Sequence, residues 1–315
     1  MSWVSYAIKR VFVSLLLLLA ASLVIFSIVR LIPGDPALII LGQFAEAGAA
    51  ETIREELGLN EPFFTQYFIW LEGLLTGNWG ESIMTGTPIA DLILIRFPRS
   101  LQLAFMGIAI GIIIAFPLGI YAAVNRNSNA DYGALFFSQF GVSIPNFWLG
   151  IMFILIFARY LNVLPASGHV AFTEDPIANL QHAFLPALTI GIINAAIFTR
   201  YIRSEMLEEL GKDYVRTARA FGHSRKRIIR KYVLKNAAPP TVTIIGIQFG
   251  YMVGGIVIIE EVFTYPGLGQ LLLNSLFSRD YPVVQLALLT LVATFIFVNL
   301  IVDLIYGYLD PKIKY

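Results

Sequence analysis

Long unbroken apolar stretches recur along the chain, separated by polar segments. Six of them lie near residues 11–29, 101–124, 134–157, 184–198, 239–262 and 283–308. About 20 apolar residues form a helix that matches a hydrocarbon core of roughly 30 Å. Glycine, serine, threonine and proline interrupt the stretches, and neighbouring helices can accommodate these residues inside a membrane. The pattern therefore predicts an all-α polytopic membrane protein with six transmembrane helices.

The composition supports lipid as the solvent for most of the chain. Hydrophobic residues make up 57% of the 315 residues and charged residues only 14%, whereas a soluble domain carries about 25% charged residues. A cleaved secretory signal is the alternative reading of the first stretch, but a signal has an apolar region of only about 7–15 residues. The chain has no cysteine, which excludes disulfides and thiolate chemistry.

The basic residues are distributed unevenly between the two sides that six spans define. Sixteen of the 22 fall at the termini or in the loops after the second and fourth spans. Because cytoplasmic loops retain Lys and Arg, both termini should be cytoplasmic. Four segments follow: an N-terminal transmembrane helix (1–30), an extracytoplasmic cap (31–100) with helix-like stretches at 51–57 and 62–75, a five-helix core (101–308) with a loop at 200–236, and a cytoplasmic tail (309–315).

The loop between the fourth and fifth spans has more structure than a connector needs. It carries eleven basic residues against four acidic ones. Tyr214, Ala218 and Phe221 recur at i, i+4 and i+7, with basic residues off that stripe, which predicts a short amphipathic helix. Gly222 can end this helix, and Ser224 can cap a second one. Positive-inside bias alone explains the charge but not the periodicity, so we expect this helix to fit a groove on a partner protein.

A family resemblance rests on this loop. Residues 214–222, followed by Leu234-Lys235-Asn236-Ala237 and Pro239, resemble the EAA loop of ATP-binding cassette importer permeases. The family's opening Glu-Ala-Ala is degenerate here, as Arg216-Thr217-Ala218, which is similar to the peptide and nickel branch. In that family the loop carries a coupling helix that sits in a cleft of the ATPase subunit. The resemblance assigns coupling to Tyr214, Arg216, Ala218, Arg219, Ala220, Phe221 and Gly222.

The resemblance extends over nearly the whole chain. Matching segments are Pro33-Gly34-Asp35-Pro36, Leu57-Gly58-Leu59-Asn60, Gly77-Asn78-Trp79-Gly80, Ser143-Ile144-Pro145-Asn146-Phe147-Trp148-Leu149-Gly150, Leu185-Pro186-Ala187, Glu260-Glu261-Val262-Phe263, Pro266-Gly267-Leu268-Gly269, Asp280-Tyr281-Pro282-Val283 and Leu309-Asp310-Pro311. Each is weak alone, but their order and spacing together are specific. The resemblance implies a type I importer permease fold, a B-type subunit and a multi-pass place in a prokaryotic plasma (inner) membrane.

Enzyme chemistry is not visible in the sequence. The Gly-Lys pair at 211–212 is followed by Asp213, and Met206 stands where a P-loop needs its first glycine. His169, His182 and His223 lie in three different regions of the sequence, so a metal site is not expected. We predict no catalytic residue, no metal and no cofactor on this chain, with ATP and Mg²⁺ on partner subunits.

Several residues in or beside the spans are candidates for the pathway or its gate. Gly246, Gly250 and Gly254 repeat every four residues on one helical face, which favours static helix packing over a moving gate contact. Gln248 and Asn299 need partners or water within a span, so they could line the pathway. For Asp303, near the cytoplasmic end of the last span, a structural pairing is favoured over a proton relay.

Glu260 and Glu261 end the fifth span on the outer side, next to Phe263. The resemblance places this segment near the extracytoplasmic gate. The carboxylates could meet a cationic group of the substrate, or they could only anchor the helix at the interface. The sequence leaves both readings open.

The leading functional hypothesis is a permease subunit of a binding-protein-dependent importer. The resemblance implies a second homologous permease, two ATP-binding cassette ATPases, an extracytoplasmic substrate-binding protein and membrane lipid as partners, with no nucleic acid. Short peptides are the first choice of substrate and nickel or a metal chelate the second. An ion-coupled carrier would need ionisable residues near the midplane and usually an inverted repeat, and a membrane hydrolase would need a catalytic constellation. Ionisable residues near the midplane, an inverted repeat and a catalytic constellation are not evident in the sequence.

Overall fold

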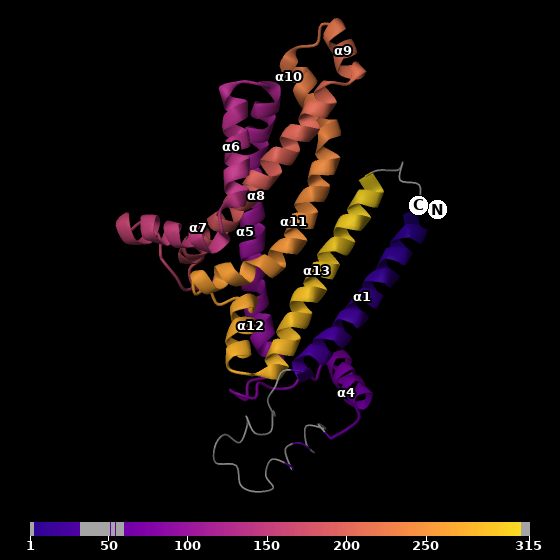
Figure 1. The fold of residues 1–315 in the computed structure, drawn as a ribbon, viewed down its shortest axis with the longest axis vertical. Helices are drawn as coiled ribbons and strands as arrows, with labels where there is room; N and C mark the ends of the chain where they lie inside the picture. Colours follow the sequence, from indigo (N-terminus) through magenta and orange to yellow (C-terminus); the bar gives the residue numbers. More distant parts are fainter. Residues whose placement is uncertain (1–2, 32–50, 52–53, 55–59, 310–315) are drawn as a thin grey trace.

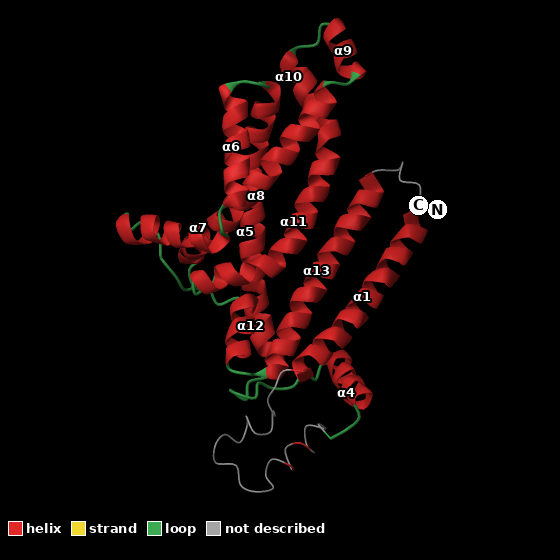
Figure 2. Cartoon of the chain, viewed as in Figure 1, coloured by secondary structure: helices red, strands yellow, loops and turns green. Residues whose placement is uncertain are grey.

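The chain is a bundle of long helices (Figures 1 and 2). The computed structural model describes residues 3–31, 51, 54 and 60–309. In this part the helices are α1 (Trp3–Leu31), α4 (Phe63–Thr76), α5 (Ile89–Val124), α6 (Asn129–Ser143), α7 (Asn146–Phe153), α8 (Pro176–Leu210), α9 (Asp213–Ala220), α10 (Arg225–Arg227), α11 (Leu234–Val262), α12 (Leu268–Phe277) and α13 (Tyr281–Leu309). Two π-helical segments, η2 (Ile154–Tyr160) and η3 (Ile228–Val233), continue α7 and precede α11. The all-helical fold is therefore confirmed for the described residues.

Four helices, α1, α5, α8 and α13, are long and apolar enough to cross a membrane alone. Among the described residues two bent pairs raise the number to six if each pair crosses as one span. The first pair joins α6 to α7 and η2 at an angle of 102°, and the second bends by 57° near Met252 within the stretch from α10 to α11.

The third predicted span, at 134–157, is two helices rather than one straight helix. Ile144 has extended backbone angles, φ −78° and ψ 129°, and Pro145 is the N-cap residue of α7. Proline lacks an N–H group and disfavours the helical conformation of the residue before it, so the helix breaks at this point. Figure 1 shows α7 projecting sideways from the bundle.

The helices α5 and α8 form the centre of the fold and extend well past their predicted spans of 101–124 and 184–198. The 36 residues of α5 make a helix of about 54 Å. Its glycines lie against α8: a Cβ atom added at Gly119 would approach Ile202 to 2.9 Å, and one at Gly191 of α8 would approach Ile110 to 2.6 Å. Small residues thus let the two backbones come close together.

The first and last helices pack side by side at the edge of the bundle (Figure 1). The Arg10 guanidinium lies 2.9 Å from the Asp303 carboxylate, so Asp303 has the structural pairing that was favoured for it. At the other end of α1, Phe26 is fully buried against the aromatic rings of α4. The predicted helix at 62–75 is therefore confirmed as α4, while most of the predicted helix at 51–57 lies outside the described residues.

Candidate functional site

The helix predicted for coupling is present as α9, at one end of the bundle (Figure 1). Its end is closed by Gly222, whose φ is +74°. The N–H of Gly222 donates to the carbonyl of Arg219 at 2.9 Å, and the N–H of His223 donates to that of Ala218 at 3.2 Å. This pair of bonds is a Schellman cap, which needs a left-handed residue at the position of Gly222. Residues 223–224 then lead directly into α10.

The buried face of α9 is not the predicted stripe of Tyr214, Ala218 and Phe221. Val215 and Ala218 are the buried residues, and they share a core cluster with Ile228 and Val233 of η3. Phe221 lies past the last helical turn, where 78% of it is exposed. Arg216, Arg219 and Ala220 are exposed as well. The predicted coupling residues therefore present one large aromatic ring and two guanidinium groups on the outside of the molecule.

Tyr214 faces inward instead. It is half-buried, and its hydroxyl donates to the carboxylate of Glu209 in the last turn of α8. Burial raises the pKa of Tyr214 above its ordinary value of 10, so the phenol stays protonated. Ser224, predicted as an N-cap, precedes α10 without a capping bond from its side chain, although its carbonyl accepts from the N–H of Ile228 at 3.0 Å.

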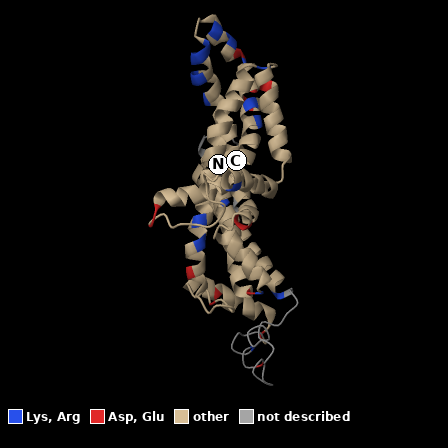
Figure 3. Cartoon of the chain, turned by 90° about the vertical axis from the view of Figure 1, so that its left-hand side faces the viewer, with Lys and Arg blue, Asp and Glu red and all other residues tan. Residues whose placement is uncertain are grey.

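Basic residues gather at the same end of the molecule (Figure 3). Arg225 donates to the carbonyl of Val124 at 2.6 Å, which ties α10 to the end of α5. Arg203 of α8 makes two bonds to the buried carboxylate of Asp131 in α6, at 2.5 and 2.8 Å. A cavity of about 480 Å³ lies at this end, lined by Val124, Leu210, Arg219, His223, Arg225, Ile228 and Ile229. The α5–α6 turn, α8, α9 and α10 thus form one basic face at this end of the molecule.

At the opposite end, the two glutamates that end α11 have different surroundings. Glu260 is fully buried, and its carboxylate accepts from the Ser100 hydroxyl at 2.5 Å and from the N–H of Gln270 at 3.0 Å. It therefore caps the N-terminus of α12. A Cβ atom at Gly267 would overlap the Glu260 carboxylate, which explains why the turn needs glycine there. Phe263 is buried too, whereas Glu261 is exposed, so Glu261 is the carboxylate that a solute could reach.

A buried aspartate fastens the 80–88 segment to the bundle. Asp280, in the turn between α12 and α13, accepts from the Ser82 hydroxyl and from the N–H of Ile83. The 80–88 segment that carries Ser82 is a tight hairpin, closed by bonds such as Ser82 N–H to Thr87 O at 2.9 Å. This contact gives a structural role to the Asp280-Tyr281-Pro282 segment noted in the sequence.

A polar cluster at the α12 end was not found from the sequence. Gln102 donates to Asn179 at 2.5 Å, Asn179 donates to the carbonyl of Val170 at 2.7 Å, and the Tyr265 hydroxyl donates to Gln102 at 3.3 Å. His169 packs its ring edge against Tyr265, with 5.4 Å between ring centroids. Burial lowers the pKa of His169 to about 4, with smaller contributions from the positive charge of Arg99 and from His182. The cluster holds the 161–175 loop on the turn after α11.

His169 and His182 lie in one region of the structure, although they are 13 positions apart in the sequence. A Cβ atom at Gly168, next to His169, would lie 3.8 Å from the His182 ring. His223 lies at the α9 end, where its ring stacks on Tyr232 at 5.8 Å.

The glycine face of α11 contacts α13 at two of its three positions. A Cβ atom at Gly246 would overlap the Val302 side chain, and one at Gly250 would lie 3.3 Å from Phe295 and 3.4 Å from Asn299. Gly254 has no atom within 4 Å of such a Cβ among the described residues, and α11 bends next to it. Asn299 donates to the carbonyl of Phe295 in its own helix at 3.0 Å, and Gln248 is half-buried.

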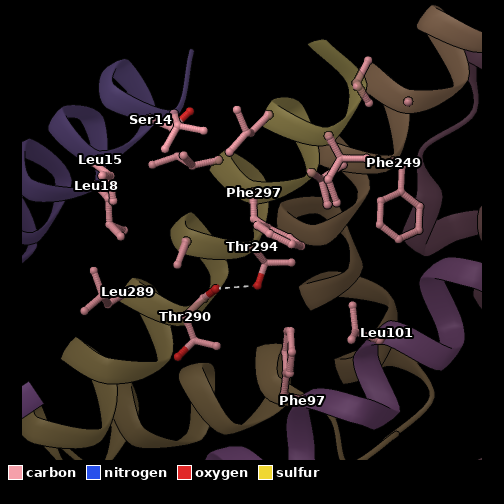
Figure 4. A pocket seen from close by; sticks show the side chains of 18 of the residues that line it. Ser14, Leu15, Leu18, Phe97, Leu101, Phe249, Leu289, Thr290, Thr294 and Phe297 are labelled. Atoms are coloured by element: carbon pink, nitrogen blue, oxygen red, sulfur yellow. Dashed lines mark hydrogen bonds between the residues drawn. The ribbon is translucent and has the colours of Figure 1, made fainter. Parts of the chain in front are cut away.

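A cavity of about 1200 Å³ lies between α1, α5, α11 and α13 (Figure 4). Its walls are almost entirely apolar side chains, such as Leu15, Phe97, Phe249 and Phe297. The three threonine hydroxyls in the lining are bonded within their own helices: Thr243 to the carbonyl of Pro239, Thr290 to that of Leu286 and Thr294 to that of Thr290. A chain of polar amides would therefore be poorly solvated in this cavity.

Comparison with known proteins identifies similar sequences over the full length. A family described as the binding-protein-dependent transport system inner membrane component matches residues 115–315, and the N-terminal component of such systems matches residues 3–104. The chain is 38% identical to the dipeptide transport system permease protein DppB of Alkalihalophilus pseudofirmus and to the oligopeptide transport system permease protein AppB of Bacillus subtilis, in both cases over 99% of each chain.

A solved structure supports the fold. The inward-facing methionine ABC transporter MetNI has a chain that superposes with a TM-score of 0.57 at 21% identity, covering 71% of this chain and 98% of that one. At this identity the likeness concerns the arrangement of the helices alone.

Proposed function

Because this chain belongs to the family of binding-protein-dependent transport system inner membrane components, we propose that it is the permease subunit of an ATP-driven importer for short peptides. The observation that carries the coupling part of this proposal is α9. Its inner face is fixed to the bundle by Val215 and Ala218, while Phe221 and two arginines stand outside. An apolar ring flanked by positive charge suits a groove on a separate ATPase.

The proposed topology places α9, the start of α1 and the end of α13 in the cytoplasm, with six spans in a prokaryotic inner membrane. The basic residues at the α9 end support this orientation, because cytoplasmic segments retain Lys and Arg. The pairing of Arg10 with Asp303 supports a common side for the start of α1 and the end of α13. The cap with α4 and the α12 turn then face outward.

The proposed assembly contains a second, similar permease, two ATPases that bind ATP and Mg²⁺, and an extracytoplasmic binding protein. Closure of the ATPases on ATP would displace α9 and, with it, the helices to which α9 is attached. Those helices include α8 and α11, and α11 carries the bend near Gly254 and the turn to α12. The chain itself contributes no step of ATP hydrolysis in this scheme.

Short peptides are the proposed substrates because the relatives similar over the full length are named as dipeptide and oligopeptide permeases. Nickel or a metal chelate, the second choice from the sequence, is not favoured by these relatives. Glu261 is the exposed carboxylate at the outer end of α11, and it could meet the cationic amino terminus of a peptide.

A substitution at the tip of α9 tests the docking. Phe221 is 78% exposed, so Phe221→Asp should leave the fold intact while placing a negative charge in the ATPase groove. Phe277→Asp is the matched control, because Phe277 is 81% exposed on α12 at the opposite end. We expect the Phe221→Asp chain, and a chain lacking residues 214–222, to lose the ATPases in a pull-down. A Phe221→Asp chain that retains them as fully as the Phe277→Asp chain would refute docking through α9.

A further inference from the structure

The turn between α8 and α9 contains a buried carboxylate whose two oxygen atoms both accept hydrogen bonds. Glu209 is only 8% exposed, although it lies in the last turn of α8. One carboxylate oxygen accepts from the Lys212 ammonium at 2.5 Å, and the other accepts from the Tyr214 hydroxyl. Both oxygens are therefore engaged by residues that follow α8 in the chain.

The phenol is the polar attachment of α9 to the bundle. Its hydroxyl donates to Glu209, so that one side chain of α9 is bonded to the last turn of α8. The other attachment of α9 is apolar, through Val215 and Ala218 against Ile228 and Val233.

These two kinds of attachment differ in what they can transmit. Apolar packing is non-directional, so a small helix can rotate or slide on such a face with little change in contact. Hydrogen bonds to a charged group are short and directional, and they fix the position of the donor. Beyond the covalent link at residues 211–212, the bond from the phenol to Glu209 is therefore the contact that fixes α9 on α8 in one orientation.

We propose that Tyr214 is a positioning residue that makes α9 move as one body with α8, through its hydroxyl bond to Glu209. This inference rests on the proposed docking of an ATPase on α9. It assigns to Tyr214 no contact with the ATPase, and it adds Glu209 to the coupling machinery. Without the hydroxyl, ATP hydrolysis continues, but the spans follow it less often.

The test uses the complete importer, with both permeases, the ATPases and the binding protein, reconstituted in liposomes. Tyr214→Phe keeps the ring and its packing and removes only the hydroxyl. We expect peptide import to fall about tenfold, within the range set by typical coupling free energies, while ATP hydrolysis changes by less than about twofold. The ATP hydrolysed per peptide imported then rises about fivefold or more.

Two further variants separate this role from a purely structural one. Tyr232→Phe is the control, since Tyr232 lies at the same end of the molecule and stacks on His223 through its ring; its import should equal that of the unaltered protein. Glu209→Gln keeps an acceptor oxygen for the phenol and should retain most of the import, whereas Glu209→Leu removes the acceptor and should reproduce Tyr214→Phe.

Binding of the ATPase is measured in the same preparations. The chain has no cysteine, so a single cysteine at Thr217→Cys, an exposed position of α9 that leaves Phe221 in place, can report cross-linking to the ATPase. Unchanged cross-linking in Tyr214→Phe with a raised ratio of ATP to peptide supports the proposal. Unchanged import overturns it, and so does loss of the ATPase together with import, because Tyr214 would then only keep α9 folded. Failure of docking itself is detected separately by Phe221→Asp.

Discussion

The hydroxyl of Ser100 bridges the carboxylate of Glu260 and the N–H of Leu268. It donates to Glu260 at 2.5 Å and accepts from Leu268 at 2.8 Å. Three helices, α5, α11 and α12, are joined at this one oxygen atom. The turn that follows α11 is therefore fixed to the central helix of the bundle rather than free to swing.

Replacing Ser100 by alanine should weaken that junction. Glu260 would lose a donor and Leu268 an acceptor while both stay buried, which costs about 1–3 kcal/mol. Thermal unfolding in detergent measures the effect. Ser138→Ala is the matched control, because the Ser138 hydroxyl is buried with no hydrogen-bond partner among the described residues, and its loss should be neutral or slightly stabilising. Equal melting temperatures for the two variants would contradict the bridging role of Ser100.

The contact of α11 with α13 predicts a contrast between two glycines. A methyl group at Gly246 meets the Val302 side chain, whereas one at Gly254 meets open space among the described residues. Gly246→Ala should therefore cost about 1–3 kcal/mol through overpacking, and Gly254→Ala should cost much less.

The double variant Gly246→Ala with Val302→Ala provides the internal check. Removing the opposing methyl groups should recover part of the stability that Gly246→Ala loses, because the two side chains occupy the same space. Purely additive losses, measured by the same unfolding assay, would show that Gly246 does not pack on Val302.

Two aspartates within the apolar helices should differ in importance. The Asp131 side chain is 1% exposed against Arg203 at 18%, while Asp303 and Arg10 are 36% and 43% exposed. Asp131→Asn leaves the half-buried guanidinium of Arg203 without its charge partner and should cost about 3–5 kcal/mol. Asp303→Asn breaks an exposed pair, worth about 1 kcal/mol or less.

Peptide import by the Asp303→Asn protein tests whether Asp303 has a role beyond its pairing with Arg10. Because the carboxylate pairs with Arg10 at the edge of the bundle, peptide import should remain close to that of the unaltered chain. A loss of import with full stability would revive the proton-relay reading of Asp303.

The surroundings of His169 predict a loss of stability in acid. In the folded protein burial holds the pKa of His169 at about 4, below its ordinary value of 6.5, with Arg99 and His182 contributing. The unfolded chain therefore binds a proton that the folded chain does not, and stability falls as the pH drops from about 6.5 towards about 4. His169→Asn should show a smaller drop in melting temperature between pH 7 and pH 5. An identical drop in both proteins would contradict a depressed pKa.

Local patterns in the sequence predicted the helices and the cap of α9 well. Apolar runs mark α1 and α13, and Gly222 ends α9 because its left-handed backbone is a local requirement. The break at Pro145 was missed because proline is tolerated in membrane helices, and only packing decides whether the chain bends or continues. The sequence does not predict how far α8 extends, because the apolar run ends before the helix does. The charged part of α8 stays helical and places Arg203 against Asp131 of α6.

The roles of two site residues could not be predicted from the sequence, because each depends on a contact with another helix. The sequence left Glu260 between a solute contact and an interfacial anchor, because its partner Ser100 is 160 positions away. Tyr214 was taken as part of the apolar stripe because periodicity cannot reveal that its hydroxyl meets Glu209. The role of Glu260 depends on a residue far away in the sequence, and that of Tyr214 on a bond across the turn between two helices, so the periodicity within one helix predicts neither.

The central claim is that this chain moves solute only through a separate ATPase docked on α9. Liposomes that contain the two permeases, with binding protein and labelled dipeptide present, are compared with and without the ATPases and ATP. We predict accumulation against a gradient only when both ATPases and ATP are present, and its loss with Phe221→Asp. Sustained uphill accumulation without any ATPase would contradict the account.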